Sequence, residues 1–179
     1  MIHLQRHTRP HVAQGICYGQ TDVPLHPDTR ELETAAVLES LDALSFSKVY
    51  TSPLQRCRLL AEAICLNKGL EAPTVDPRLM EMNFGKWEMC SWQAIFESSA
   101  GKAWFGNFME QPTPQGESFA DVLARATDFF RSEKLPSDAL IVTHDGFIRA
   151  ALVCHGLLDT AHAFDERYPY GILKELPLP

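Results

Sequence analysis

The stretch ALIVTHDG at residues 139–146 decides the fold. Its uninterrupted apolar run, 139–143, is typical of a strand buried on both faces, as in a parallel sheet covered by helices. A helix is predicted directly after it, through Ile148, Ala151 and Leu152, and it ends near Gly156. His144 therefore stands at the carboxyl end of a strand, where a helix begins.

Two further strands are predicted earlier in the chain. Ile2 and Leu4 alternate with polar residues, which is the period of a short strand, and the pattern stops at residues 6–8. Residues 49–51 predict the other strand. The pair Ser52-Pro53 follows it and favours a helix with Ser52 as N-cap and Pro53 at the first helical position.

Helices are expected between and after these strands. Asp28 and Glu31 resemble a capping box for a helix reaching about residue 44, and residues 118–133 carry one apolar stripe, with Ser118 as a cap. Strands that alternate with helices predict an α/β fold, a three-layer α/β/α sandwich with a mostly parallel central sheet. No repeat or linker divides residues 1–179, so we expect a single domain.

Composition narrows the classes of partner. The chain has 23 acidic and 16 basic residues, a formal charge of −7, which argues against nucleic acid. Its apolar runs are too short for a membrane span. The five cysteines are scattered and form no C-x-x-C pair, which indicates reduced, mostly buried thiols and a cytoplasmic protein.

Reactive or cationic residues follow each predicted strand: Arg6-His7, Ser52 to Arg56, and His144. Ligands of parallel sheets bind at the carboxyl ends of the strands. Two arginines, a partly cationic His144 and a helix N-terminus would together suit a phosphate dianion. Taken singly, a histidine at a strand end is more often structural.

Metal ligation is the competing interpretation, because His3, His7 and His11 would share one face of a helix. The strand-like alternation and Pro10 disfavour that helix. The sequence contains no H-E-x-x-H motif, no Gly-rich phosphate loop for ATP or NAD, and no G-x-S-x-G. We therefore expect neither a metal nor a cofactor.

Five motifs in order carry a family resemblance: LQRHT at 4–8, SPLQR at 52–56, LMEMNFGKWE at 79–88, GES at 116–118 and VTHDG at 142–146. Together they resemble the histidine phosphatase superfamily, whose fold is phosphoglycerate mutase-like. The loop GICYGQTDVPL at 15–25 most resembles the α-ribazole phosphatases of this superfamily.

The resemblance implies a role for each matching residue. His7 would be the nucleophile that forms a phosphohistidine, and the phosphoryl oxygens would be held by Arg6, Arg56 and His144. Glu81 would be the general acid and then the base, with a pKa raised by burial beside Phe84 and Trp87.

Less certain roles fall on residues that an ordinary loop or helix end would also use. Substrate contacts are implied for Thr8, Tyr18, Gln20, Thr21 and Asp145, while Glu88 would support the loop around Glu81. The chain departs from the family pattern at Thr8, Pro10, Ala13 and Met89, where the family usually has Gly, Thr, Asn and Gly.

These observations predict a metal-independent phosphomonoesterase acting on a small phosphorylated metabolite. The resemblance makes α-ribazole 5′-phosphate or adenosylcobalamin 5′-phosphate, in cobalamin lower-ligand assembly, the first candidate. A sugar phosphatase or a phosphoglycerate mutase is the enzyme alternative, although the short chain leaves little room for a mutase's extra segments. A phospho-ligand binding module is the alternative outside enzymes. The oligomeric state is not predicted.

Overall fold

A five-stranded sheet forms the centre of the protein in the computed structural model, which describes residues 1–177. Its order is β3-β2-β4-β1-β5, with β1 (Ile2–Arg6), β2 (Val49–Thr51), β3 (Thr74–Val75), β4 (Leu140–Thr143) and β5 (Leu173–Leu176). The first four strands are parallel and β5 is antiparallel to β1. The prediction of a mostly parallel sheet is confirmed; β3 and β5 lacked a sequence signal.

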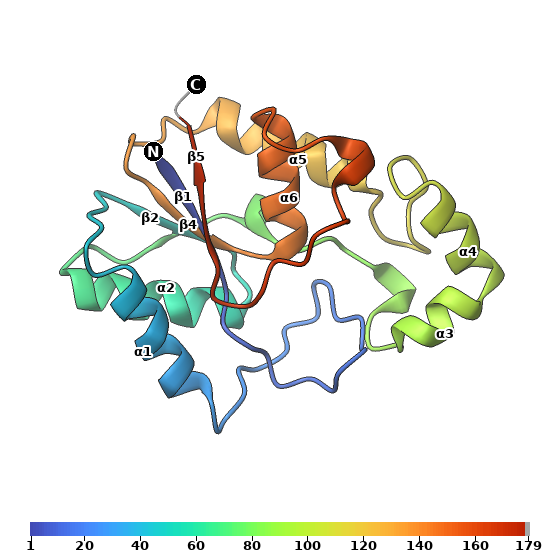
Figure 1. Cartoon of the computed structure of the whole chain (residues 1–179), viewed down its shortest axis with the longest axis horizontal. Helices are drawn as coiled ribbons and strands as arrows, with labels where there is room; N and C mark the ends of the chain where they lie inside the picture. The colour runs from blue at the N-terminus through green and yellow to red at the C-terminus, as the bar shows by residue number, and fades with distance from the viewer. Residues whose placement is uncertain (178–179) are drawn as a thin grey trace.

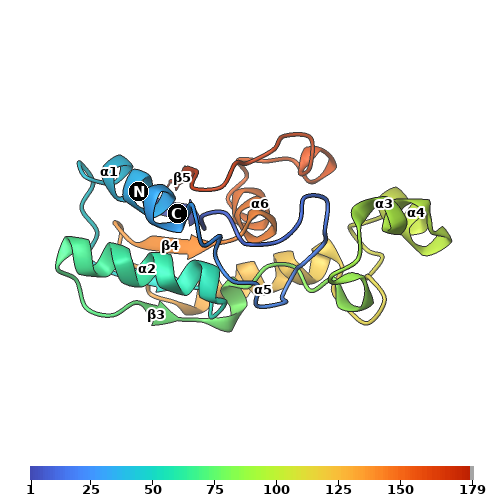
Figure 2. The same ribbon diagram turned by 90° about the horizontal axis from the view of Figure 1, so that it is seen from below.

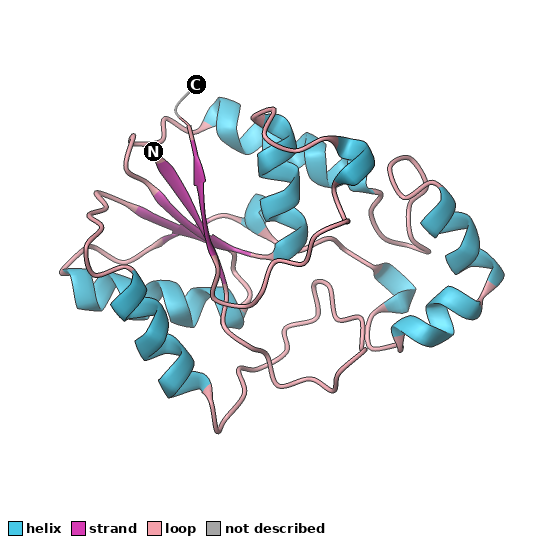
Figure 3. Cartoon of the chain, viewed as in Figure 1, coloured by secondary structure: helices cyan, strands magenta, loops and turns pink. Residues whose placement is uncertain are grey.

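Helices cover both faces of this sheet (Figures 1 and 2). Helices α1 (Arg30–Ser40) and α2 (Gln55–Lys68) lie on one face, and α5 (Phe119–Ser132) and α6 (Asp145–Cys154) on the other. Helices α3 (Trp92–Glu97) and α4 (Ser99–Gly106) project beyond the sheet. Short 3-10 turns occupy Pro77–Leu79, Gly85–Trp87 and Thr160–His162, and long loops join the remaining elements (Figure 3).

Strand β4 separates two hydrophobic cores. Ile141 packs into the core formed with α5 and α6, whereas Leu140 and Val142 pack into the core formed with α1 and α2. All four residues of β4 are buried, as the apolar run 139–143 predicted. The three-layer sandwich is confirmed.

Strand β1 is also buried on both faces, although three of its five residues are polar. Gln5 is fully buried and its amide donates to the carbonyl of Ile172 at 3.3 Å. Because residues 2–6 form a strand, His3, His7 and His11 do not share a helical face. Within residues 1–177, no three His, Cys, Asp or Glu side chains gather as a metal site requires.

Two of the three predicted N-caps are wrong. Helix α5 begins at the expected cap, where the Asp121 amide donates to Ser118 Oγ at 3.2 Å and Asp121 completes a capping box. Helix α1 begins after Thr29 without a side-chain cap, so Asp28 and Glu31 form no capping box. Helix α2 begins at Gln55 rather than at Ser52-Pro53.

A distant residue caps α2. The Gln55 amide donates to Asp22 Oδ1 at 2.8 Å, and the Gln55 side chain donates to the Asp22 carbonyl at 2.9 Å. This contact comes from a loop 33 residues earlier, so no local pattern predicts it. The Ser52 hydroxyl lies before the helix start, where it accepts from the Leu54 amide at 3.3 Å.

No helix in the described part of the chain is long and apolar enough to cross a membrane. All five cysteines are free; Cys17, Cys57 and Cys65 are buried as expected, whereas Cys90 and Cys154 are exposed.

The two N-caps allow a matched test of cap energetics. Replacement Ser118→Ala removes an acceptor from the α5 amides and is expected to lower the free energy of unfolding by about 1 kcal/mol. Thr29→Ala is the control, because Thr29 makes no side-chain cap bond, and it should leave stability nearly unchanged. Urea denaturation measures both; equal losses would contradict this assignment.

Candidate active site

The register of β1 against β4 brings two histidines together. Arg6 pairs with Thr143, and the next residues, His7 and His144, leave the sheet side by side. The His7 amide donates to the Thr143 carbonyl at 3.1 Å, and the two imidazole centroids lie 5.1 Å apart. Both rings are almost completely buried at the carboxyl end of the sheet.

His7 is held in the tautomer that a nucleophile needs. Its Nδ1 lies 2.6 Å from the carbonyl oxygen of Thr8. A carbonyl only accepts hydrogen bonds, so Nδ1 carries the proton and Nε2 keeps a free lone pair. Burial, followed by the charges of Arg56 and Arg6, lowers the pKa of His7 well below its usual value. The ring is therefore neutral at neutral pH, as predicted.

His144 is neutral too, which corrects the expectation of a partly cationic side chain. Burial is the largest cause of its lowered pKa, and the charge of Arg56 is the next. Its Nε2 lies 2.8 Å from Ser52 Oγ. Ser52 thus orients the imidazole instead of capping α2.

The two arginines carry the positive charge of the site. Arg56 is fully buried and donates to the carbonyls of Gly19 at 2.6 Å and Thr21 at 3.0 Å. Arg6 donates to the Tyr168 carbonyl. Neither guanidinium forms a salt bridge with any carboxylate in residues 1–177.

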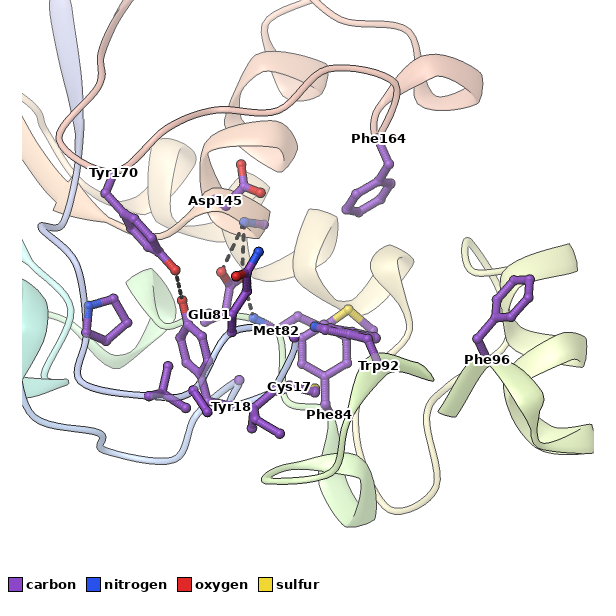
Figure 4. Close-up of a pocket in the computed structure, with 18 of the residues that line it drawn as sticks. Cys17, Tyr18, Glu81, Met82, Phe84, Trp92, Phe96, Asp145, Phe164 and Tyr170 are labelled. Atoms are coloured by element: carbon purple, nitrogen blue, oxygen red, sulfur yellow. Dashed lines mark hydrogen bonds between the residues drawn. The ribbon is translucent and has the colours of Figure 1, made fainter. Parts of the chain in front are cut away.

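Glu81 is half-buried and lies beside Asp145 at the start of α6 (Figure 4). Its Oε1 accepts from the amides of Met82 at 2.9 Å and Gly146 at 3.0 Å. Burial raises the pKa of Glu81, and the like charge of Asp145 adds to the rise. Asp145 was not foreseen as a cause.

The expected aromatic environment of Glu81 is half correct. Phe84 lines the same cavity as Glu81. Trp87 instead packs against Trp104, with ring centroids 5.7 Å apart.

Loop 17–21 is tied to the acid by its own side chains. The Gln20 side chain donates to the Glu81 carbonyl at 2.9 Å, and the Gln20 backbone amide donates to Glu88 Oε1 at 2.9 Å. Thr21 donates to Glu88 Oε2 at 2.5 Å. Gln20 and Thr21 therefore position the loop, and Glu88 supports it as expected. Substrate contacts of Gln20 and Thr21 stay a prediction.

The other predicted contact residues lie close to His7 or in the adjoining cavity. The Thr8 hydroxyl is buried and finds no hydrogen-bond partner among the described residues. Tyr18 and Asp145 line the cavity.

Arg149 is structural: it is buried and pairs with Asp145 at 3.1 Å. Met89, where the family usually has Gly, adopts a left-handed φ of 65°.

The cavity holds about 1290 Å³ and opens beside Arg6 and Glu81 (Figure 4). Its wall away from the cations is aromatic, with Phe84, Trp92, Phe96, Trp104, Phe105 and Phe164. Sequence reasoning missed this cavity and also Tyr170, which lies beside His7 with ring centroids 5.5 Å apart. Neither Phe164 nor Tyr170 belongs to a motif that could have signalled it.

The model of the histidine phosphatase superfamily, branch 1, matches residues 2–170. The chain belongs to this superfamily. This histidine phosphatase is therefore an enzyme, as predicted, and the motif resemblance is confirmed.

Relatives of this histidine phosphatase carry several names. It is 28% identical over 162 residues to a predicted phosphoserine phosphatase of Hydrogenobacter thermophilus, covering 86% of this chain and 76% of the relative. It is 27% identical over 144 residues to the adenosylcobalamin/α-ribazole phosphatase of Escherichia coli, covering 75% and 68%. The α-ribazole phosphatase structure from Shigella flexneri shares its fold, with a TM-score of 0.81, 24% identity and coverage of 96% and 87%.

The buried histidines of this histidine phosphatase predict acid sensitivity. Because the pKa values of His7 and His144 are lowered in the folded state, the unfolded chain binds more protons below pH ~6.5, and stability falls as pH drops from there. Each histidine contributes a slope of up to about 1.4 kcal/mol per pH unit.

The variant His7→Gln should lose one such slope between pH 6.5 and 5, measured by urea denaturation at several pH values. His11→Gln removes an exposed imidazole and serves as the control. If both variants kept the wild-type slope, the neutral buried state of His7 would be wrong.

Proposed function

We propose that this protein hydrolyses phosphomonoesters of small metabolites through a phosphohistidine at His7. The observation that carries the proposal is the pair Arg6 and Arg56, which lie beside His7 without a carboxylate partner in the described chain. A buried cation without a counterion is costly, and a phosphate dianion would supply that counterion.

In the first step His7 Nε2 attacks phosphorus and the bond from phosphorus to the leaving oxygen breaks. Glu81, whose raised pKa keeps a proton available, gives that proton to the leaving oxygen. In the second step Glu81, now ionised, takes a proton from water. The water oxygen bonds to phosphorus, the phosphorus–nitrogen bond breaks, and neutral His7 and inorganic phosphate are released.

The surrounding groups stabilise charge on the phosphoryl oxygens during both steps. Arg6 and Arg56 supply fixed positive charge in a buried site. The Thr8 hydroxyl, which lacks a partner in residues 1–177, would donate to one oxygen. A bound dianion offsets the arginine charges next to His144 and would raise its pKa, so His144 could then also donate.

The finer proposal concerns the leaving group, for which we infer α-ribazole 5′-phosphate or its adenosylcobalamin counterpart. The aromatic wall offers stacking surfaces; Phe84 and Trp92, for example, lie with ring centroids 5.1 Å apart. A leaving group with a flat aromatic base would bury its faces there. Phosphoserine and 3-phosphoglycerate have no such surface, so the wall favours the ribazole class over sugar phosphatase or mutase substrates.

Two broader alternatives, a mutase and a phospho-ligand binding module, would give different products in an activity assay. A mutase returns an isomerised phosphate ester rather than free phosphate. A phospho-ligand binding module would bind without turnover, and a carboxylate such as Glu81 beside the phosphate would only weaken that binding.

We also propose a cytoplasmic location, supported by five free cysteines.

Acid–base quenching of the enzyme with 32P-labelled p-nitrophenyl phosphate in EDTA tests the intermediate. Wild type should give base-stable, acid-labile label on His7, and His7→Gln should give none. Because p-nitrophenol leaves without a proton, Glu81→Gln should still form the label but hydrolyse it about 10² to 10⁴ times more slowly.

The matched control is Glu62→Gln, an exposed residue on α2 that pairs with Arg58, and this variant should turn over like wild type. Absence of label on wild-type His7 together with absence of EDTA-resistant phosphate release would overturn the phosphatase proposal. Unchanged turnover in Glu81→Gln would remove Glu81 from the acid–base role.

Trp92→Ala tests the leaving-group proposal. Loss of one stacking surface should raise KM for α-ribazole 5′-phosphate roughly tenfold. The KM for phosphoserine should not change, and Leu66→Ala, an exposed apolar residue of α2, should alter neither value. Equal effects of Trp92→Ala on both substrates in steady-state assays would contradict an aromatic leaving group.

A further inference from the structure

Two tyrosines from opposite ends of the chain meet above the buried histidine. The hydroxyls of Tyr18 and Tyr170 lie 3.0 Å apart, within hydrogen-bond distance (Figure 4). The Arg6 guanidinium lies 4.3 Å from the centroid of the Tyr170 ring, and Arg56 lies 5.1 Å from that of Tyr18. Each tyrosine thus packs on one of the two phosphate-binding cations.

The tyrosines lie at the border of the cavity. Arg6, Glu81 and both tyrosines line the cavity, whereas His7 is only 1% exposed and Arg56 is not exposed at all. Tyr170 also lies beside His7. Tyr170 therefore borders both the cavity and His7, and its hydroxyl contact with Tyr18 lies at that border.

Backbone hydrogen bonds anchor the segments that carry the two tyrosines. The Gly171 amide donates to the His7 carbonyl at 3.1 Å, and Gly171 holds a left-handed φ of 73° that favours glycine. On the other side, the Thr21 amide donates to the Tyr18 carbonyl at 2.8 Å. Rotation of a tyrosine side chain needs no loop rearrangement.

We propose that Tyr18 and Tyr170 form a tyrosine gate over His7, and that the entering phosphoryl group replaces the hydroxyl contact by accepting a hydrogen bond from Tyr170. Tyr170 is then a phosphate-contacting residue outside every sequence motif. The identity of the ligand rests on the proposed function, whereas the closed contact between the two tyrosines does not depend on it. Burial and the neighbouring Tyr170 raise the pKa of Tyr18, so it keeps its proton at neutral pH.

Carbethoxylation by diethyl pyrocarbonate, followed residue by residue with mass spectrometry, measures access to His7 without any need for activity. The neutral His7 ring should react much more slowly than exposed His11 in the same sample. Tyr170→Phe removes the hydroxyl contact and should speed labelling of His7 about fivefold, the effect of one hydrogen bond on an equilibrium. Tyr170→Ala should speed it further.

Tyr168→Phe is the matched control, because that ring packs on Arg149 and the variant keeps the backbone carbonyl that Arg6 uses. It should leave His7 labelling unchanged. Circular dichroism establishes that each variant is folded. Labelling of His7 in Tyr170→Ala within twofold of wild type would overturn the gate.

Inorganic phosphate tests the second half of the proposal. Phosphate should protect wild-type His7 from labelling. A hydrogen bond to an anion is stronger than the neutral hydroxyl contact that it replaces, so Tyr170→Phe should still raise the half-protecting concentration, about fivefold, whereas Tyr168→Phe should not. An unchanged concentration would show that Tyr170 does not contact phosphate. If the enzyme proved inactive while the gate variants still exposed His7, only the proposed function would fail; active enzyme with unaltered access would leave only the gate refuted.

Discussion

The parallel register between β1 and β4 is the constraint on which the site depends. Arg6 opposite Thr143 means that His7 and His144 each leave their strand at the same level of the sheet. A shift of one residue would turn every side chain of β1 to the opposite face and separate the two imidazoles. Strand β2 completes the arrangement, because the Ser52 amide donates to the Val142 carbonyl at 3.1 Å and its hydroxyl reaches His144. Backbone hydrogen bonds therefore set the spacing of the reactive groups.

Electrostatic interactions and burial then give the side chains of the site different charges. The arginines donate to carbonyl oxygens, while burial and the arginine charges lower the pKa values of both histidines. The result is a His7 imidazole with a free lone pair beside two arginines that form no salt bridge within residues 1–177. Burial and the like charge of Asp145 raise the pKa of Glu81 in the same site. A protein of net charge −7 thus concentrates positive charge at one point.

The sequence predicted what depends on neighbouring residues. The apolar run before His144 marked a buried strand, and Ser118 with the apolar stripe after it marked a helix start, because each signal lies within a few neighbouring positions. Predictions failed where a distant segment decided the outcome. Asp22 caps α2 from another loop, so the favourable pair Ser52-Pro53 does not begin the helix. Tyr170 and the aromatic wall come from separate segments, and no local spacing announces where they meet.

The projecting position of α3 and α4 has an evolutionary consequence. Groups around His7 come from strand ends in the centre of the fold, whereas Trp92, Phe96 and Phe105 come from a short segment at its margin (Figures 1 and 2). Substitutions in that segment can reshape the space for a leaving group without disturbing the sheet register. Proteins of this fold can therefore diverge to accept different phosphate esters through substitutions in α3 and α4 that leave the residues around His7 unchanged.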